Sequence, residues 1–224
     1  MIDDFISLFF PRLCLGCNGT LLKGEKQVCI HCYTNAENTD SHLDKENFIK
    51  QKFYGKVDVS LALAYFVFLK GGIVQHLLHN LKYENQPELG LELGMRYASE
   101  LLNYSEEWPF ELIVPVPLHR SKLKLRGYNQ SEEFANGLAC TLNIPVNNAL
   151  KRIKATTTQT SKSKLERWKN VDQIFEVIDK EVVGKHILLV DDVITTGSTL
   201  ESCIQTLNAA GASEVSVMAI AAAK

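Results

Sequence analysis

Two carboxylates and a hydroxyl-rich turn lie next to each other near the C-terminal end of this 224-residue sequence. Asp191 and Asp192 stand near the end of the apolar run of residues 184–193, which predicts a buried strand. The turn that follows contains Thr195, Thr196, Gly197, Ser198 and Thr199. A helix is predicted to begin there, and the first backbone N–H groups of a helix attract anions. The pattern therefore predicts a site for a monophosphate at the edge of an α/β sheet.

The paired aspartates indicate what the rest of that ligand is. Neighbouring residues of an extended strand point to opposite faces, so Asp191 and Asp192 do not form an acid–base couple across one bond. Carboxylates next to a phosphate site are suited to accept hydrogen bonds from the vicinal hydroxyl groups of a ribose 5-phosphate. Phosphoribosyl diphosphate satisfies both halves of the pattern, which makes the two aspartates the candidate catalytic and substrate-binding residues.

Two other interpretations use the same residues. An apolar strand that ends in aspartates also occurs in P-loop ATPases, but neither Gly-Lys pair of the chain, at residues 55–56 and 184–185, is followed by serine or threonine. The second alternative is an ordinary helix cap. A cap needs one polar group, whereas this turn supplies about six, so a ligand-binding turn is favoured.

Four of the six cysteines form two Cys-x-x-Cys pairs near the N-terminus. Cys14 and Cys17 are separated by 11 residues from Cys29 and Cys32. Two such pairs can direct four thiolates tetrahedrally onto one ion, and the expected metal is a structural zinc, because four thiolates leave no open position. A redox-active pair is the alternative, but no βαβ pattern surrounds these cysteines.

The elements that would position these residues alternate along the chain. Four apolar runs predict strands, at residues 59–68, 111–118, 184–193 and 214–222. Four segments with apolar residues at helical spacing predict helices, at residues 72–83, 93–101, 131–142 and 200–207, and Ser131 is predicted to cap the third. This alternation predicts an α/β fold with a mainly parallel sheet flanked by helices. We expect a cysteine-rich head over residues 1–35, a linker over 36–56 and the main domain over 57–224.

Charge and hydropathy limit the possible settings. The net charge is -2, but residues 119–170 contain 11 Lys and Arg against 3 Asp and Glu, which predicts that this stretch meets something anionic. Apolar runs such as Leu61–Leu69 are shorter than the roughly 20 residues of a membrane helix. Asp3 and Asp4 stand where a secretory signal carries cations. We therefore expect a cytoplasmic protein without membrane insertion.

Three further segments complete the pattern. Residues 114–131 read VPVPLHRSKLKLRGYNQS, residues 152–159 follow R-x-x-x-T-x-x-Q, and residues 167–175 follow R-x-x-N-x-x-x-x-F. Together with the cysteine head and the aspartate turn, they resemble the competence protein F family over nearly the whole chain. The resemblance implies a type I phosphoribosyltransferase fold with an N-terminal four-cysteine zinc finger. It also implies phosphoribosyl diphosphate bound with Mg²⁺, and a role in DNA uptake during natural transformation.

The resemblance also assigns residues to the remaining parts of the site. The turn that binds the diphosphate would contain Pro115, Val116, Pro117, Arg120, Lys122 and Arg126. A flexible loop that closes over the substrate would contain Thr156, Gln159 and Arg167. Cations beyond a strand end suit a diphosphate with Mg²⁺. Lys82 and Tyr83 match a Lys-Tyr pair that recurs in the family, and the resemblance gives them no role.

Three functions are open on this basis. The first is phosphoribosyl transfer. The second is binding of single-stranded DNA, or of a helicase of the competence machinery, without transfer; the basic stretch and the rings of Tyr128 and Trp168 favour it, whereas the negative net charge does not. The third is a sensor of phosphoribosyl diphosphate that does not turn it over.

Overall fold

The centre of the molecule is a four-stranded sheet. A computed structural model describes residues 11–154 and 174–224, and its sheet has the order β1-β6-β5-β2 with every pairing parallel. The strands are β1 (Ala62–Val67), β2 (Leu112–Pro115), β5 (His186–Ile194) and β6 (Glu214–Ala222). A parallel sheet covered on both faces needs apolar side chains on both, and every residue of β1 and β2 is buried. The α/β fold with a mainly parallel sheet is confirmed.

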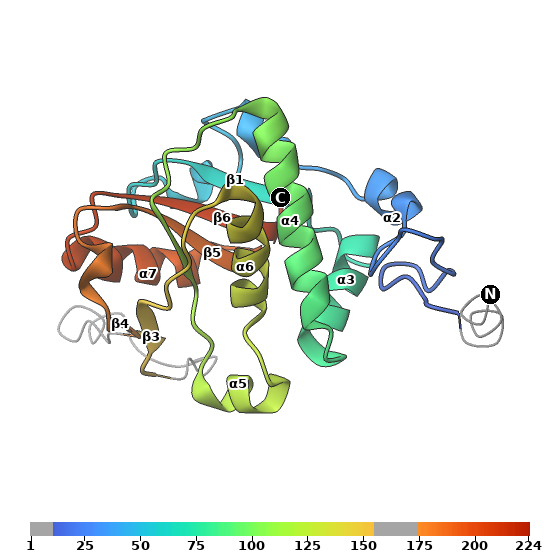
Figure 1. The fold of residues 1–224 in the computed structure, drawn as a ribbon. Coiled ribbons are helices and arrows are strands. Elements are labelled where there is room, and N and C mark those ends of the chain that lie inside the picture. The colour runs from blue at the N-terminus through green and yellow to red at the C-terminus, as the bar shows by residue number, and fades with distance from the viewer. Residues whose placement is uncertain (1–10, 155–173) are drawn as a thin grey trace.

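Helices cover both faces of this sheet (Figure 1). One face packs against α3 (Ile73–Tyr83), α4 (Pro87–Tyr104) and α6 (Gln130–Leu142). The other packs against α7 (Ser198–Ala209) and the antiparallel pair of β3 (Leu150–Arg152) and β4 (Phe175–Val177). The carboxyl ends of β2 and β5 therefore point toward the first turns of α6 and α7, where the predicted site residues lie.

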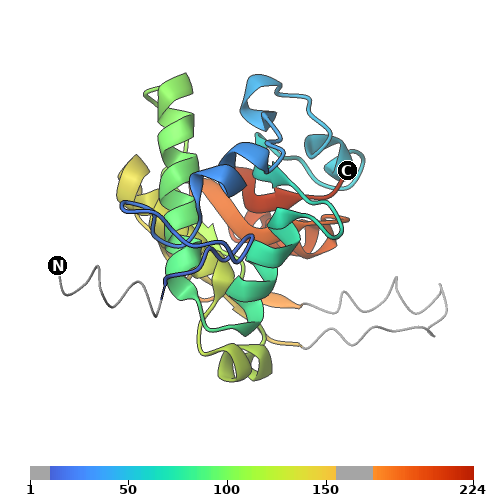
Figure 2. The same ribbon diagram turned by 90° about the vertical axis from the view of Figure 1, so that its right-hand side faces the viewer.

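The head docks on the main domain through α3 and α4, as both ribbon views show (Figures 1 and 2). It contains the short helix α2 (Ile30–Asn35). Glu92 of α4 accepts hydrogen bonds from the backbone N–H of Gln27 at 2.8 Å and from the Tyr33 hydroxyl at 3.0 Å. Asn80 of α3 donates to the carbonyl of Leu15 at 2.9 Å. The head and the main domain consequently share one apolar core.

The segment predicted as a linker packs against the sheet. It contains two 3-10 helices, η1 (Ser41–Leu43) and η2 (Lys50–Phe53). Ile49 and Phe53 are fully buried in the same core as α7. Residues 36–56 are thus part of the main domain's packing, while the domain boundaries as such stay a prediction.

The chain between β2 and α6 forms a short helix, α5 (Arg120–Arg126), that projects from the body of the molecule (Figure 1). None of its residues is buried. Asn129, rather than the predicted Ser131, caps α6, because its side-chain oxygen accepts from the Ser131 N–H at 3.3 Å. The Ser131 hydroxyl is thereby left to make a contact with β5. A last short 3-10 helix, η4 (Lys180–Val182), leads into β5.

Across residues 11–154 and 174–224, no helix combines the length and the apolar character that crossing a membrane requires.

Candidate functional site

Asp191 is fixed in place by two hydrogen bonds. Its Oδ1 atom accepts from the Ser131 hydroxyl at 3.1 Å and from the backbone N–H of Asp192 at 2.8 Å. Ser131 lies in the first turn of α6, so the start of that helix holds the carboxylate at the carboxyl end of β5. The second carboxylate oxygen has no protein partner among these contacts and is the atom suited to accept from a ligand hydroxyl.

Asp192 is held by a cation from another helix. The Lys82 ammonium at the end of α3 lies 3.1 Å from Asp192 Oδ1. Only 20% of the lysine side chain and 13% of the aspartate side chain are exposed. The two adjacent carboxylates are therefore oriented by different helices of the same layer, α6 and α3.

Burial makes ionisation of Asp191 unfavourable. Desolvation first, and then repulsion from Asp192, raise the pKa of Asp191 from 3.8 to about 7. Hydrogen bonds from Asp192 and Ser131, and the charge of Lys82, act in the opposite direction without cancelling the effect. A carboxyl group with such a pKa is partly protonated at neutral pH, and a nearby cation or hydrogen-bond donor favours its ionised form.

This shift predicts a pH-dependent effect of Asp191→Asn on stability. Between the unfolded pKa of about 4 and the folded pKa of about 7, the folded state binds the extra proton, so rising pH removes stability. Asparagine cannot ionise but keeps the oxygen that accepts from Ser131. We expect the variant to melt at least about 3 °C above the wild type at pH 8, with the difference shrinking toward pH 5.

Scanning calorimetry at both pH values measures this difference. The matched control is Asp58→Asn, an exposed carboxylate that lies beside the beginning of β6, at the opposite edge of the sheet. A variant that melts below the wild type at pH 8 would contradict the assignment of a buried, disfavoured charge.

The hydroxyl-rich turn lies at the beginning of α7. Gly197 is the N-cap residue with φ of 79°, a left-handed conformation that side chains other than glycine rarely adopt. The Thr196 and Ser198 hydroxyls are 2.9 Å apart. The turn and Asp191 surround a hollow of about 40 Å³. The first N–H groups of α7 open into the same place, which gives an anion backbone donors and hydroxyl donors together.

The Phe53 ring packs against this turn. A Cβ atom on Gly197 would lie 3.0 Å from the Phe53 ring, so the ring and the turn are in direct contact. Phe53 is 1% exposed and comes from the segment predicted as a linker. That segment therefore positions the turn, a role that its polar composition did not indicate.

The predicted diphosphate residues divide into two groups. Pro115 and Val116 lie beside β5, where the Val116 N–H donates to the Val190 carbonyl at 2.8 Å and the Val116 carbonyl accepts from Asn129 at 3.1 Å. Pro117 follows them, half-buried. Arg126 turns back toward the site and donates to Gln130 at 2.7 Å.

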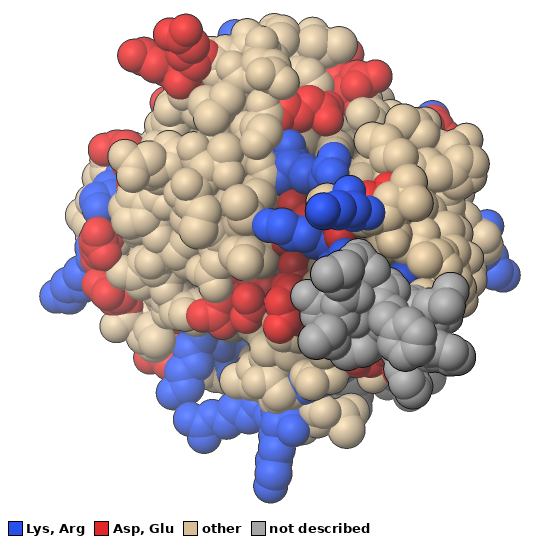
Figure 3. Space-filling model, turned by 45° about the vertical axis from the view of Figure 1, so that its right-hand side comes forward, with Lys and Arg blue, Asp and Glu red and all other residues tan. Residues whose placement is uncertain are grey.

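The other two predicted cations are exposed to solvent. Arg120 and Lys122 are exposed on α5, as is Lys124. Figure 3 shows Lys and Arg side chains gathered at the lower end of the molecule, where Figure 1 places this helix. The described structure thus brings Arg126, but not Arg120 or Lys122, near the first turn of α6.

The four cysteines of the head meet at one point. Their sulfur atoms all lie within 4.8 Å of one another, with Cys14 and Cys32 3.6 Å apart and Cys17 and Cys29 3.7 Å apart. A tetrahedral ion with metal–sulfur bonds of about 2.3 Å requires sulfur atoms about 3.8 Å apart. The donor set and its spacing therefore fit a tetrahedral metal.

The protonation of these thiols depends on what lies between them. Burial opposes the thiolate of Cys14, but N–H groups of Cys29, Gly16 and Cys17 lower its pKa to about 7. Burial raises the pKa of Cys29 and of Cys32. A divalent cation at the centre would keep all four as thiolates, because metal binding displaces their protons.

Comparisons with known proteins agree with this architecture. A family model described as a phosphoribosyl transferase domain matches residues 129–224. Over 237 aligned positions the chain is 31% identical to competence protein F of Haemophilus influenzae, and the match covers 96% of this chain and 99% of that protein. The chain belongs to the competence protein F family.

Two more relatives extend the comparison. The DNA utilization protein YhgH of Escherichia coli is 34% identical over 145 residues, which cover 63% of each chain. Competence protein ComFC of Bacillus subtilis is 26% identical over 194 residues, which cover 80% of this chain and 77% of that protein. This member of the competence protein F family thus has a phosphoribosyltransferase-like domain and a four-cysteine cluster that fits a metal.

Some residues that the family resemblance assigns have no described place. Thr156, Gln159 and Arg167 of the predicted flexible loop lie outside the described residues, as does Trp168. Conversely, Lys82, Ser131 and Phe53 were not predicted as site residues, but the structure places them in contact with Asp192, Asp191 and Gly197. The Lys-Tyr pair was the one sequence signal for Lys82, and nothing in the sequence pattern indicated the role of Phe53.

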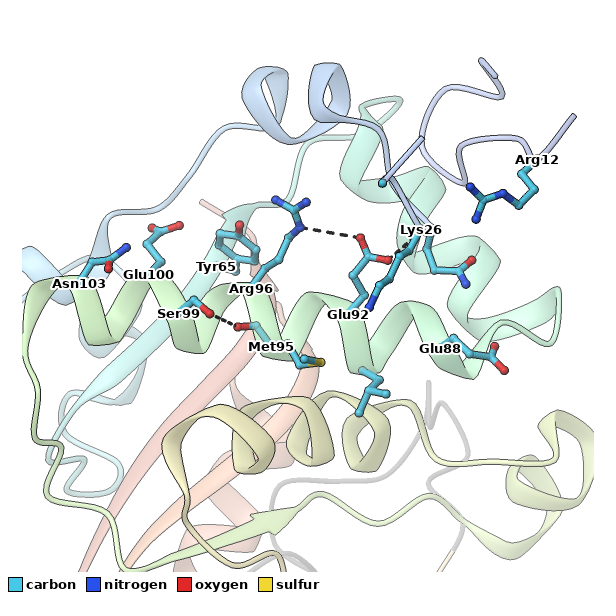
Figure 4. A pocket seen from close by; sticks show the side chains of 13 residues that line it. Arg12, Lys26, Tyr65, Glu88, Glu92, Met95, Arg96, Ser99, Glu100 and Asn103 are labelled. Atoms are coloured by element: carbon cyan, nitrogen blue, oxygen red, sulfur yellow. Dashed lines mark hydrogen bonds and ion pairs between the residues drawn. The ribbon is translucent and has the colours of Figure 1, made fainter. Parts of the chain in front are cut away.

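A larger groove runs along α4, away from the carboxylates. It has a volume of about 860 Å³, and Figure 4 shows Glu92 and Arg96 on α4 beside Arg12 and Lys26 of the head. Glu92 and Arg96 form an ion pair at 3.8 Å, and Arg96 lies over the Tyr33 ring at 3.8 Å. Neither the aspartates nor the hydroxyl-rich turn lines this groove, so it is separate from the hollow at the end of β5.

Proposed function

We propose that this protein binds phosphoribosyl diphosphate with Mg²⁺ and acts as a phosphoribosyltransferase in DNA uptake. The observation that carries the proposal is the arrangement at the end of β5. Two oriented carboxylates, Asp191 and Asp192, adjoin an anion-binding turn at the beginning of α7. A phosphate beside vicinal hydroxyl groups is the ligand chemistry that matches both parts. The names of the relatives, competence protein and DNA utilization protein, support the biological setting.

Each part of the ligand has candidate partners. Residues 195–199 would hold the 5-phosphate, while Asp191 and Asp192 would accept hydrogen bonds from the ribose hydroxyls. Pro115, Val116, Pro117 and Arg126 would line the diphosphate side. Bound Mg²⁺ would balance the charge of the departing diphosphate. Transfer of the ribosyl group needs no covalent nucleophile, so orientation and electrostatic stabilisation are the contributions of the chain.

We propose zinc as the metal of the four-cysteine cluster. Four thiolates with sulfur–sulfur distances of 3.6 and 3.7 Å suit zinc, which takes tetrahedral sulfur ligands in structural sites. A fully ligated ion has no open position for a substrate, so its role is to hold the head in shape.

Calorimetric titration with phosphoribosyl diphosphate tests the proposed function. In the presence of Mg²⁺ we expect saturable binding that Asp192→Asn weakens by about ten- to a hundredfold, because a charge-assisted hydrogen bond is lost. The double variant Asp191→Asn with Asp192→Asn is expected to bind undetectably.

The control variant for this titration is again Asp58→Asn. Asp58 lies beside the beginning of β6 and does not line the hollow at the turn, so this variant is expected to leave the affinity unchanged. A wild-type protein that does not bind the ligand with Mg²⁺ would refute the proposal. Unchanged affinity in the double variant would refute the ribose assignment alone.

Binding of single-stranded DNA is the second candidate, and helix α5 is the observation that favours it. Its cations Arg120, Lys122 and Lys124 are exposed on a projecting element, which suits contact with a phosphate backbone. A single-stranded oligonucleotide in place of the small ligand, titrated at two salt concentrations, separates the two functions. Salt-dependent binding that survives the double aspartate variant would support a DNA surface distinct from the ribose site.

A further inference from the structure

The ion pair between Lys82 and Asp192 differs from an ordinary surface pair. Its two charged atoms are 3.1 Å apart, and both side chains are largely shielded from solvent. Exposed pairs contribute little to stability, whereas a shielded charge needs its partner. Lys82 therefore orients the Asp192 side chain at the end of β5 through a shielded, charge-assisted contact.

The charge balance of the site changes when the proposed ligand binds. Two carboxylates at the end of β5 repel a phosphorylated sugar, and a diphosphate adds further negative charge next to them. The ribose hydroxyls bring the hydrogen bonds that Asp192 needs, so they can replace the ammonium group there. A cation released at that moment would be available to pair with the negative charge of the diphosphate.

The other cations near the candidate site are either exposed or already in contact with protein groups. Arg120 and Lys122 are exposed on α5, and Arg126 is engaged by Gln130 and by the face of the Tyr83 ring at 5.3 Å. Lys82, in contrast, already contacts Asp192. Its four-carbon stem lets the ammonium group move while the backbone of α3 stays fixed.

We propose that Lys82 is a ligand-binding residue that leaves Asp192 when the ribose hydroxyls arrive and then contacts the diphosphate of the bound ligand. This inference rests on the proposed function and adds a residue to it. The exchange couples the two ends of the ligand, because the sugar frees the cation that the diphosphate uses. Ribose 5-phosphate frees the same cation but offers it no diphosphate.

Two ligands and two lysine variants test this exchange. Affinities for phosphoribosyl diphosphate with Mg²⁺ and for ribose 5-phosphate are measured by calorimetry for the wild type, Lys82→Met and Lys82→Arg. We expect Lys82→Met to weaken phosphoribosyl diphosphate by about tenfold or more, and ribose 5-phosphate by less than about twofold. Lys82→Arg is expected to restore part of the loss, because it keeps the charge.

The control variant is Lys185→Met, which removes a more exposed ion pair with Glu181 at 2.8 Å, and which should change neither affinity. Melting curves verify that the Lys82 variants are folded.

An equal loss of affinity for both ligands would overturn the inference and leave Lys82 as a residue that only orients Asp192. Tighter binding of both ligands would also overturn it, because Lys82 would then be a competitor for the site. A wild type that binds ribose 5-phosphate but not phosphoribosyl diphosphate overturns this inference together with the proposed substrate, and a wild type that binds neither ligand refutes both.

Discussion

Cys32→Ser is expected to abolish tight binding of the zinc that we propose for the head, and to destabilise the whole protein by about 4 kcal/mol or more. The Cys32 side chain is 1% exposed, and its sulfur lies 3.6 Å from that of Cys14. Structural zinc contributes its binding free energy directly to folding, and three thiolates bind it far less tightly than four. Metal analysis and scanning calorimetry of the purified variant measure both effects.

The destabilisation should not be confined to the head. Buried head residues share a core with α3 and α4, and Glu92 and Asn80 bind head backbone and side-chain groups directly. Because α3 also carries Lys82, a loosened head is expected to weaken the ion pair with Asp192. The calorimetric transition of the variant should therefore stay a single one, at a lower temperature.

Cys140→Ser serves as the control, because Cys140 is exposed on α6 and distant in sequence from the cluster. It should keep one metal per chain and an unchanged melting temperature. A wild type purified with iron, or a Cys32→Ser protein with full metal content, would contradict the tetrathiolate zinc site.

Local patterns were sufficient to predict the parts of the site that are contiguous in sequence. The apolar run before Asp191 forms β5, and the glycine-containing turn begins α7, because a buried parallel strand and a helix start each have a local signature. The two Cys-x-x-Cys pairs converge for the same reason, since each knuckle is built by neighbouring residues. These predictions needed no knowledge of the tertiary structure.

The residues that the sequence did not reveal act across long distances in the chain. Lys82 reaches a residue 110 positions later, and Phe53 supports Gly197 from a segment whose polar composition resembles a linker. Ser131 was predicted as a cap, but Asn129 takes that position and frees the hydroxyl for Asp191. Periodicity describes one element at a time, so contacts between elements require the structure.

The basic residues between β2 and α6 also show that contacts between elements do not follow from the sequence alone. The family resemblance assigned Arg120, Lys122 and Arg126, which closely follow a predicted strand end, to the turn that binds the diphosphate. The chain folds into α5 instead, and a helix distributes adjacent residues around its axis. Arg126 alone of these three is engaged beside the first turn of α6. Proximity in sequence thus did not indicate which of these cations contacts α6.

Gly137→Ala is expected to destabilise the protein by about 3 kcal/mol or more and to impair the site at a distance. A Cβ atom on Gly137 of α6 would meet the Leu91 carbonyl and would lie 2.9 Å from the Gly94 Cα atom. Both contacts are to the backbone of α4, which cannot rotate away as a side chain can. The helices must therefore separate, although alanine favours the helical conformation by about 1 kcal/mol over glycine.

Separation of α4 and α6 also moves the first turn of α6, which holds Asp191 through Ser131. We therefore expect weaker ligand binding together with a lower unfolding midpoint in denaturant. Gly94→Ala should behave in the same way, because its Cβ atom would meet the Phe134 carbonyl of α6. Ser99→Ala on the exposed side of α4 is the control and should leave both quantities unchanged. If Gly137→Ala keeps the wild-type midpoint, the close crossing of α4 and α6 does not limit stability as stated here, and the expected effect on the position of Asp191 is wrong.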